Sequence, residues 1–333
     1  MGDYVTGKYR QRSSDGQADP ETRINERIQD WRRGPHRVSK VERICYVTGW
    51  HGCGKTRLLQ WIADRFDGRY LDLETRARAP HETPQAFKKH ATQQLQVGQR
   101  SGLLLLCVDH VPPDADDALR LLEEEILHPA WEEGIAFLLM AQQHPRRSCW
   151  VALPRLDPLW IPSFTSRGSE KLLKQLGCKD HNIQGEIHRI SDGHPMLIKK
   201  LWDGYQEPGD YVKYVKGARE FLEYWLRRVG AEEDLDTLLR FAYPLSLVED
   251  LSDTTSIGKA LNAYSVHERP ARARTRLQQV WWIEARRTNK GFAYYWVEPV
   301  QRCVEYLFKA EHPQEYKKVE QALQESRSEG GEK

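Results

Sequence analysis

The chain has 333 residues, of which 39% are hydrophobic and 29% are charged, and its formal net charge is +2 at pH 7. This length allows two or three domains with cores of their own, and the composition is that of a globular protein. The sequence contains no run of 18 apolar residues and no signal-peptide h-region, so no membrane partner is expected. Six scattered cysteines, without a CxxC pair or zinc-ligand spacing, favour a cytoplasmic location.

The N-terminal segment precedes the first predicted core. Residues 1–20 are polar and predict a mobile lead. From Glu21 to Arg33, apolar residues recur on one helical face, which predicts a helix that ends at Gly34-Pro35.

A glycine-rich segment follows the first predicted strand. Residues 49–56, Gly-Trp-His-Gly-Cys-Gly-Lys-Thr, match the phosphate-binding pattern G-x-x-x-x-G-K-[ST] at every fixed position. An apolar strand over 43–48 precedes the segment and an amphipathic helix over 55–66 follows it, which is the order that such a loop requires. Glycines let backbone N–H groups converge on phosphate oxygens, and the helix start adds a favourable partial charge. The predicted nucleotide-binding residues are Gly49, Trp50, His51, Gly52, Cys53, Gly54, Lys55, Thr56 and Arg57.

Individual roles follow from this pattern. Lys55 is expected to neutralise the β- and γ-phosphates, and the Thr56 hydroxyl to ligate Mg²⁺. The apolar run 103–108 is too hydrophobic to face water and ends at Asp109, which is expected to be the second magnesium residue. Many buried strands end in aspartate without a metal, so the order of the elements carries this prediction. Lys55 and Asp109 are therefore the candidate catalytic residues.

The residue after Asp109 bears on hydrolysis. Hydrolytic P-loop enzymes often carry an acidic residue there to polarise the attacking water, whereas this chain has His110. Binding of ATP or ADP is therefore better supported than hydrolysis, and we expect slow turnover or none. Gln142 and Arg147, beyond the next strand, either sense the γ-phosphate or belong to a solvated loop. Cys53 is expected to be a reactive thiol, because it lies near a helix N-terminus.

Strands and helices alternate through the first half of the chain. The expected strands are 43–48, 69–73, 103–108 and 135–140, separated by helices over 55–66, 84–97 and 115–128. This rhythm predicts the α/β fold of a P-loop NTPase, with a parallel sheet covered by helices on both faces.

Beyond Pro154 the pattern becomes helical and ends in a predicted hairpin. Strands over 280–287 and 291–297 flank a short turn, and a helix over 299–310 follows, which is the layout of a winged-helix domain. The last ~15 residues are expected to fray. The predicted domains are a disordered lead (1–20), a P-loop NTPase domain (21–153), a helical domain (154–230), a winged-helix domain (231–312) and a helical or disordered tail (313–333).

The P-loop, the apolar strand that ends in Asp109, and Gly193-His194-Pro195 together resemble the STAND ATPases, the signal-transduction ATPases with numerous domains. The tripeptide resembles the GxP element of that family. It is also explained as helix punctuation, because a glycine can end one helix and a proline can begin the next. The resemblance implies that Pro195 lies near the adenine and that a winged helix follows.

The chain also departs from that family. The usual Gly-Arg pair of the N-terminal adenine-contacting segment is reduced to Arg23 and Glu26, and His110 replaces a second acidic residue. Neither an effector domain nor a repeat sensor is visible. The implied protein is a switch module whose partners are further copies of itself or a separate effector or sensor protein.

An alternative is an AAA+-like DNA-binding ATPase of the origin-recognition or transposition-regulator type. Residues 267–290 carry seven Arg and Lys against two Glu, a net charge of +5. Under this alternative a basic winged helix would contact DNA phosphates. A solvated basic face explains the same charges. The candidate DNA-contacting residues are Arg272, Arg274, Arg276, Arg286 and Arg287.

Overall fold

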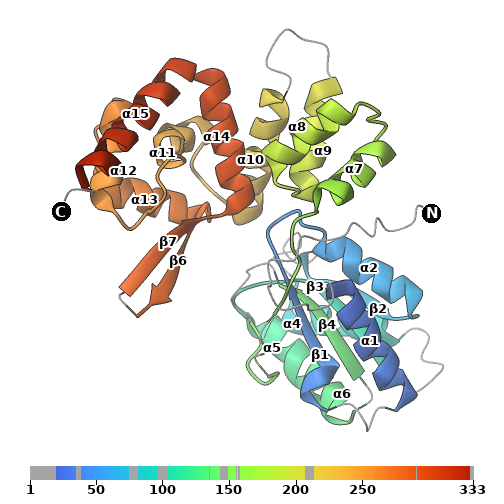
Figure 1. The fold of residues 1–333 in the computed structure, drawn as a ribbon. Helices are drawn as coiled ribbons and strands as arrows, with labels where there is room; N and C mark the ends of the chain where they lie inside the picture. Colours follow the sequence, from blue (N-terminus) through green and yellow to red (C-terminus); the bar gives the residue numbers. More distant parts are fainter. Residues whose placement is uncertain are drawn as a thin grey trace. The chain divides into compact units, whose positions relative to one another are not determined.

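The computed structural model describes residues 20–34, 39–74, 82–96, 104–134, 136–142, 149–154, 156, 158–206, 214–289 and 291–330. The chain divides into two compact units, Met1–Ser163 and Phe164–Lys333 (Figure 1). The predictions for the lead before Pro20, for Arg147 and for Lys290 fall outside the described residues. Within the described part of the chain, no helix is long and apolar enough to cross a membrane.

The first unit is built around a five-stranded parallel sheet with the strand order β2-β3-β4-β1-β5. Its strands are β1 (Ile44–Thr48), β2 (Arg69–Asp72), β3 (Leu104–Val111), β4 (Ala136–Gln142) and β5 (Leu159–Trp160). Every residue of β1 and β4 is buried, as expected of apolar strands in a sheet covered on both faces. The predicted parallel sheet is confirmed, and β5 is an additional short strand.

Helices cover both faces of this sheet (Figure 1). One face packs against α1 (Pro20–Arg33) and α2 (Lys55–Arg65), and the other against α4 (Pro84–Gln96), α5 (Asp117–Leu122) and α6 (His128–Glu132). A π-helical segment, Glu123–Leu127, joins α5 to α6. Alternate side chains of each strand enter opposite cores, since Tyr46 faces the α4 side and Val47 the α1 side.

The end of the first unit lies beyond the predicted domain boundary at residue 153. β5 pairs in parallel with β1, with Leu159 opposite Val47 and Trp160 opposite Thr48, and the compact unit extends to Ser163.

The second unit is helical and carries one hairpin. Its helices are α7 (Ser166–Gln175), α8 (His181–Ser191), α9 (Pro195–Gln206), α10 (Val215–Val229), α11 (Leu235–Leu245), α12 (Thr254–Ala263), α13 (Pro270–Gln279), α14 (Glu298–Glu311) and α15 (Pro313–Gly330). The predicted hairpin is confirmed, because β6 (Ile283–Thr288) and β7 (Gly291–Trp296) pair antiparallel. Within the expected helical or disordered tail, residues 313–330 form α15, whose Val319 and Leu323 are buried.

Candidate functional site

The loop between β1 and α2 depends on glycine at three positions. Gly49, Gly52 and Gly54 have φ angles of +155°, +80° and +104°, which other residues rarely adopt. At Gly49 space is also restricted, because a Cβ there would lie 2.6 Å from the Cys53 sulfur. The loop closes on itself through a hydrogen bond from the Cys53 N–H to the Trp50 carbonyl (3.1 Å). This alternation of left-handed glycines with other residues turns successive N–H groups toward one side, as in an anion-binding nest.

The start of α2 adds further N–H donors to the loop. Its N-cap is Gly54, which has no side chain to accept a hydrogen bond from the first turn. In α5, by contrast, the N-cap Asp116 accepts from the N–H groups of Ala118 and Leu119. The first-turn N–H groups of α2 therefore suit an external anion.

Lys55 lies folded over the loop. Its Nζ donates hydrogen bonds to the carbonyls of Gly49 (2.7 Å) and Trp50 (3.1 Å). The Lys55 residue is half-buried. A phosphate carries full negative charge and is a stronger partner than two carbonyl dipoles, so it would compete for this ammonium group. Thr56 is half-buried in the first turn of α2, and Arg57 is exposed.

The remaining loop side chains pack against the sheet edge. Trp50 contacts Trp160 of β5 edge to face, with 5.0 Å between ring centroids, and His51 is half-buried. Cys53 is 4% exposed. The reactivity of the Cys53 thiol stays a prediction, and in this conformation the sulfur lies close beneath Gly49.

Asp109 lies near the carboxyl end of β3 and is fully buried. Leu105 and Cys107, four and two positions earlier, enter the core beneath α1 and α2, so Asp109 lies on that same face of the sheet. Its Oδ2 accepts a hydrogen bond from the Tyr70 hydroxyl (2.7 Å) and its Oδ1 accepts one from the His110 N–H (2.8 Å). β3 does not end at Asp109 as expected but continues to Val111 after an irregularity in register.

Tyr70 is a site residue that the sequence analysis missed. Burial of the phenol, together with the Asp109 carboxylate, raises the pKa of Tyr70 well above its usual value. The hydroxyl therefore stays protonated and fixes the orientation of Asp109. The neighbours Asp72 and Glu74 were also missed, although they alternate with leucines at the end of a predicted strand. Asp72 is paired in register with Asp109.

The His110 side chain, on β3, contacts residues at the carboxyl end of β2. Its φ angle is +55°, which is uncommon for a residue other than glycine. Nδ1 lies 2.7 Å from an Asp72 carboxylate oxygen, and Nε2 lies 3.4 Å from a Glu74 carboxylate oxygen. The imidazole thus sits between two carboxylates at the edge of the sheet where β1 also ends.

Gln142 is the last residue of β4, the strand between β3 and β1. It is 5% exposed and is paired in register with Val111. The structure thus places a buried amide at the same sheet edge as the loop. A role of Gln142 in sensing phosphate stays a prediction.

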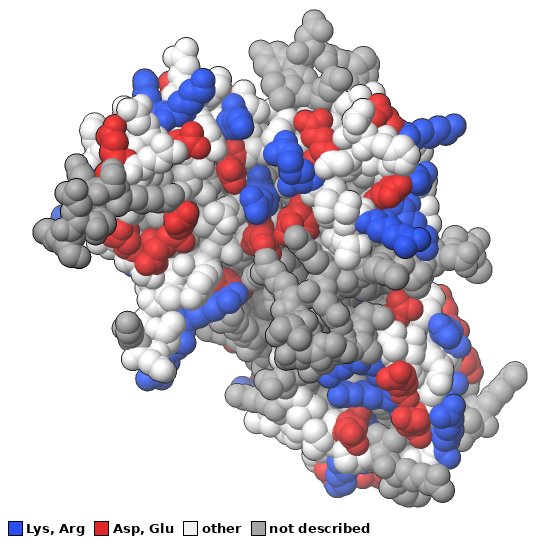
Figure 2. Space-filling view, in the orientation of Figure 1, with Lys and Arg blue, Asp and Glu red and all other residues white. Residues whose placement is uncertain are grey.

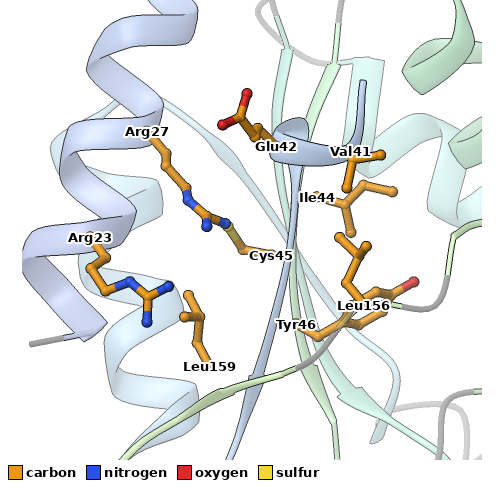
Figure 3. Close-up of a pocket in the computed structure, with 9 residues that line it drawn as sticks. All are labelled: Arg23, Arg27, Val41, Glu42, Ile44, Cys45, Tyr46, Leu156 and Leu159. Carbon is orange, nitrogen blue, oxygen red and sulfur yellow. The ribbon is translucent and has the colours of Figure 1, made fainter. Parts of the chain in front are cut away.

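The N-terminal helix places its arginines against β1. Arg23 and Arg27 point from α1 across to β1, where they line a pocket of about 170 Å³ together with Glu42 and apolar residues (Figure 3). Arg27 donates a hydrogen bond to the Cys45 sulfur (3.3 Å), and burial raises the pKa of that thiol, so the sulfur stays neutral. Glu26, the other residue expected near the adenine, is exposed.

Gly193-His194-Pro195 separates α8 from α9 in the second unit. Gly193 has a φ angle of +77°, and a Cβ there would lie 2.0 Å from the Phe164 carbonyl oxygen. The His194 ring is 1% exposed, packs on Phe221 and accepts a hydrogen bond from the N–H of Leu197. These contacts explain the tripeptide as the end of one helix and the start of the next. They also place the His194 ring in the core of the second unit. The proximity of Pro195 to a nucleotide base stays a prediction.

All three arginines of α13 make contacts within the second unit, and exposed Arg272 lies 3.7 Å from the Glu268 carboxylate. Arg274 donates to the Leu251 carbonyl (2.8 Å) and lies 3.7 Å from the Tyr294 ring centroid. Arg276 forms an ion pair with Glu233 (3.7 Å). These two arginines stabilise the packing of α13. The exposed members of the predicted DNA-contacting set are Arg272, Arg286 and Arg287.

Comparisons with known proteins establish the fold class. No protein-family model matches the chain, and no curated protein matches it. A Walker-type ATPase of Pyrococcus abyssi is similar over 86% of this chain and 94% of its own, with a TM-score of 0.55 and 12% sequence identity. The RuvB Holliday junction branch migration motor of Thermotoga maritima matches over 86% of this chain and 95% of its own, with a TM-score of 0.41 and 16% identity. The FIGL-1 AAA domain, in complex with ADP, matches over 59% of this chain and 74% of its own, with a TM-score of 0.40 and 12% identity.

At 12% identity, the likeness to the Walker-type ATPase shows the fold alone. Together with the five-stranded parallel sheet and the loop after β1, it establishes the fold of a P-loop NTPase. The STAND assignment and the winged helix stay predictions.

Proposed function

We propose that this chain is an ATP-binding molecular switch of the STAND type, whose nucleotide state controls domain arrangement and association with partners. The observation that carries the proposal is the loop between β1 and α2. Left-handed Gly52 and Gly54, a helix start without a side-chain cap, and Lys55 held over the loop together suit a polyphosphate. The similarity in fold to a Walker-type ATPase supports this interpretation.

The expected ligand is ATP or ADP with Mg²⁺. The Thr56 hydroxyl and the Asp109 carboxylate offer oxygen atoms, which are the ligands that Mg²⁺ prefers. Asp109 is buried and oriented by Tyr70, so its carboxylate is fixed before a ligand arrives. Bound Mg²⁺ would neutralise part of the negative charge of the phosphates, and Lys55 would neutralise a further part.

The switch would act through a nucleotide that touches both units. Pro195, at the start of α9, is the proposed contact with the base, whereas the phosphates would bind the loop of the first unit. A ligand can shift the arrangement of two units by at most the difference between its affinities for the two arrangements. The proposed working species is a cytoplasmic homo-oligomer or a complex with a separate effector or sensor protein.

The test of the switch is the mass and shape of the protein in solution, measured by light scattering and small-angle X-ray scattering. The conditions are ATP with Mg²⁺, ADP with Mg²⁺, and no nucleotide. We expect the wild-type profile to differ between ATP and ADP, and Lys55→Ala to give the nucleotide-free profile throughout. Identical profiles in all conditions, with nucleotide bound, would contradict the switch but leave nucleotide binding intact.

A DNA-binding ATPase remains the second candidate, because of the hairpin. Arg286 and Arg287 are exposed on β6, and Phe292, opposite Arg287 on β7, is 62% exposed. Basic side chains line the projecting hairpin on the face seen in Figure 2. Exposed arginines beside an aromatic ring suit phosphates and bases.

Salt-dependent retention on duplex DNA tests this candidate. Charge reversal of Arg286 and Arg287 to Glu should abolish retention and its salt dependence. Reversal of Arg227 and Arg228, an exposed pair on α10, makes the same change in net charge and is the matched control. Equal retention of both double variants would remove the hairpin as the DNA contact.

A further inference from the structure

The side chain of His110 is held in one position by the end of β2. With a φ angle of +55°, its backbone adopts a conformation that costs about 1–3 kcal/mol and persists only where the surroundings impose it. The contacts of Nδ1 with Asp72 and of Nε2 with Glu74 account for this orientation. His110 thus contacts the carboxylates of Asp72, the last residue of β2, and of Glu74, two residues beyond that strand.

The two carboxylates differ in how they are bound. Asp72 Oδ1 lies 2.7 Å from His110 Nδ1 and also accepts the N–H of Glu74 (2.9 Å). These two contacts hold the Asp72 carboxylate between the His110 ring and the backbone of Glu74. Glu74 Oε2 lies 3.4 Å from His110 Nε2, a longer contact that orients the carboxylate without a short bond. His110 thus makes its shorter contact with Asp72 and its longer contact with Glu74.

The arrangement is that of hydrogen bonds and not of a metal site. Oxygen and nitrogen ligands lie about 2.0–2.2 Å from a Zn²⁺ ion, which separates neighbouring ligand atoms by roughly 3 Å or more. The 2.7 Å contact between His110 and Asp72 is shorter than that. In addition, the two ring nitrogens face different carboxylates, whereas one ion would be bound through one of them.

The cluster lies beside the proposed magnesium residue. His110 Nδ1 is 3.8 Å from Asp109 Oδ2, and Asp72 is paired in register with Asp109. Glu74 follows β2 by two residues, so it lies at the carboxyl edge of the parallel sheet, the edge at which the phosphate-binding loop leaves β1. Ligands of open parallel sheets bind at this edge.

We propose that Glu74 is the general base of a slow ATP hydrolysis and that His110 is its positioning residue. The chain would thus carry, two residues beyond β2, the acidic group that is absent from the position after Asp109. Glu74 takes a proton from water while the water oxygen forms a bond to the γ-phosphorus. The bond from that phosphorus to the β,γ-bridging oxygen breaks, and its electron pair leaves with ADP. The products are ADP and phosphate, and Glu74 releases the proton to solvent.

This inference rests on the proposed nucleotide site, and single-turnover hydrolysis together with the ATP dissociation constant tests it. Glu74→Gln keeps the shape of the side chain but cannot take a proton. We expect it to lower the hydrolysis rate about 100-fold or more and to leave the dissociation constant unchanged. Asp64→Asn, on the exposed face of α2, removes the same charge and should leave both values unchanged.

The positioning role of His110 is tested by a pair of substitutions. His110→Ala removes both ring contacts and should lower the hydrolysis rate without changing the dissociation constant. His110→Asn should recover part of the rate, because asparagine tolerates a positive φ angle and can still donate a hydrogen bond. A merely structural role would change binding and rate together.

The outcomes separate this inference from the proposed function. A Glu74→Gln variant that hydrolyses ATP at the wild-type rate overturns the inference. A wild-type chain that binds ATP and never hydrolyses it also overturns the inference, and it leaves the proposed switch in place. A wild-type chain that does not bind ATP overturns the proposed function itself.

Discussion

At the residue scale, the phosphate-binding loop owes its shape to positions where a side chain cannot be accommodated. Gly49 combines a positive φ angle with a sulfur atom 2.6 Å from where its Cβ would lie. At Gly54 a Cβ would meet no described atom within 4 Å, so only its φ angle of +104° requires glycine there. The two glycines are therefore needed for different physical reasons.

Gly49→Ala should abolish ATP binding and destabilise the first unit, because the new methyl group overlaps Cys53 and the backbone is strained by about 1–3 kcal/mol. Adding Cys53→Ala should recover part of the lost free energy of unfolding, since it removes the overlapping sulfur. Chemical denaturation and calorimetric titration measure the two effects. An alanine variant with wild-type affinity would show that the loop geometry is wrong.

Tyr70→Phe should lower the free energy of unfolding by about 1–3 kcal/mol, because the buried Asp109 carboxylate loses a hydrogen-bond donor. Tyr295→Phe is the matched control, since this tyrosine is 43% exposed on the hairpin. Denaturant titrations of both variants provide the comparison. Equal stabilities would show that the Tyr70 hydroxyl does not hold Asp109.

The sequence predicts the local part of the site and misses its long-range part. Residues 49–56 form a contiguous pattern, so the loop could be found without knowledge of the fold. The contacts of Asp109 with Tyr70 and of His110 with Glu74 depend on the register of β2 against β3, which no local pattern specifies.

At the element scale, the strands and helices of the first unit follow from hydrophobic patterning. The apolar runs around Leu106 and Leu138 predict buried parallel strands, and both lie in the sheet. The two-residue strand β5 was missed because so short an element has no periodicity of its own.

Close helix packing in the second unit requires small residues. α9 and α10 approach each other at Gly204 and Gly217, where a Cβ on Gly217 would lie 2.0 Å from the Lys200 carbonyl oxygen. Backbones at this distance leave no room for a methyl group, so the helices would have to separate.

Gly217→Ala should therefore lower the free energy of unfolding by about 1–3 kcal/mol or more through overpacking. Gly185→Ala is the control, because a Cβ there would meet no described atom within 4 Å and the residue lies inside α8. This control should raise stability by up to about 1 kcal/mol through helix propensity. If both substitutions stabilise the protein, α9 and α10 are not packed as closely as described.

At the scale of the whole molecule, the chain joins a P-loop NTPase unit to a helical unit with a hairpin. The first unit supplies the phosphate-binding loop, and the second supplies the exposed arginines and Pro195. A nucleotide that biases how the two units are arranged would explain why one chain carries both. The search for the trigger and the partner begins with the nucleotide that this chain binds.

Calorimetric titration of ATP with Mg²⁺ into the wild-type chain and into Lys55→Ala tests the central claim most directly. The account predicts saturable binding at one site in the wild type and no measurable binding in the variant, because Lys55 supplies charge stabilisation to the phosphates. The variant should remain folded, since Lys55 contributes two loop hydrogen bonds and no core packing. Equal affinity for both proteins would contradict the assignment of this loop as the nucleotide site.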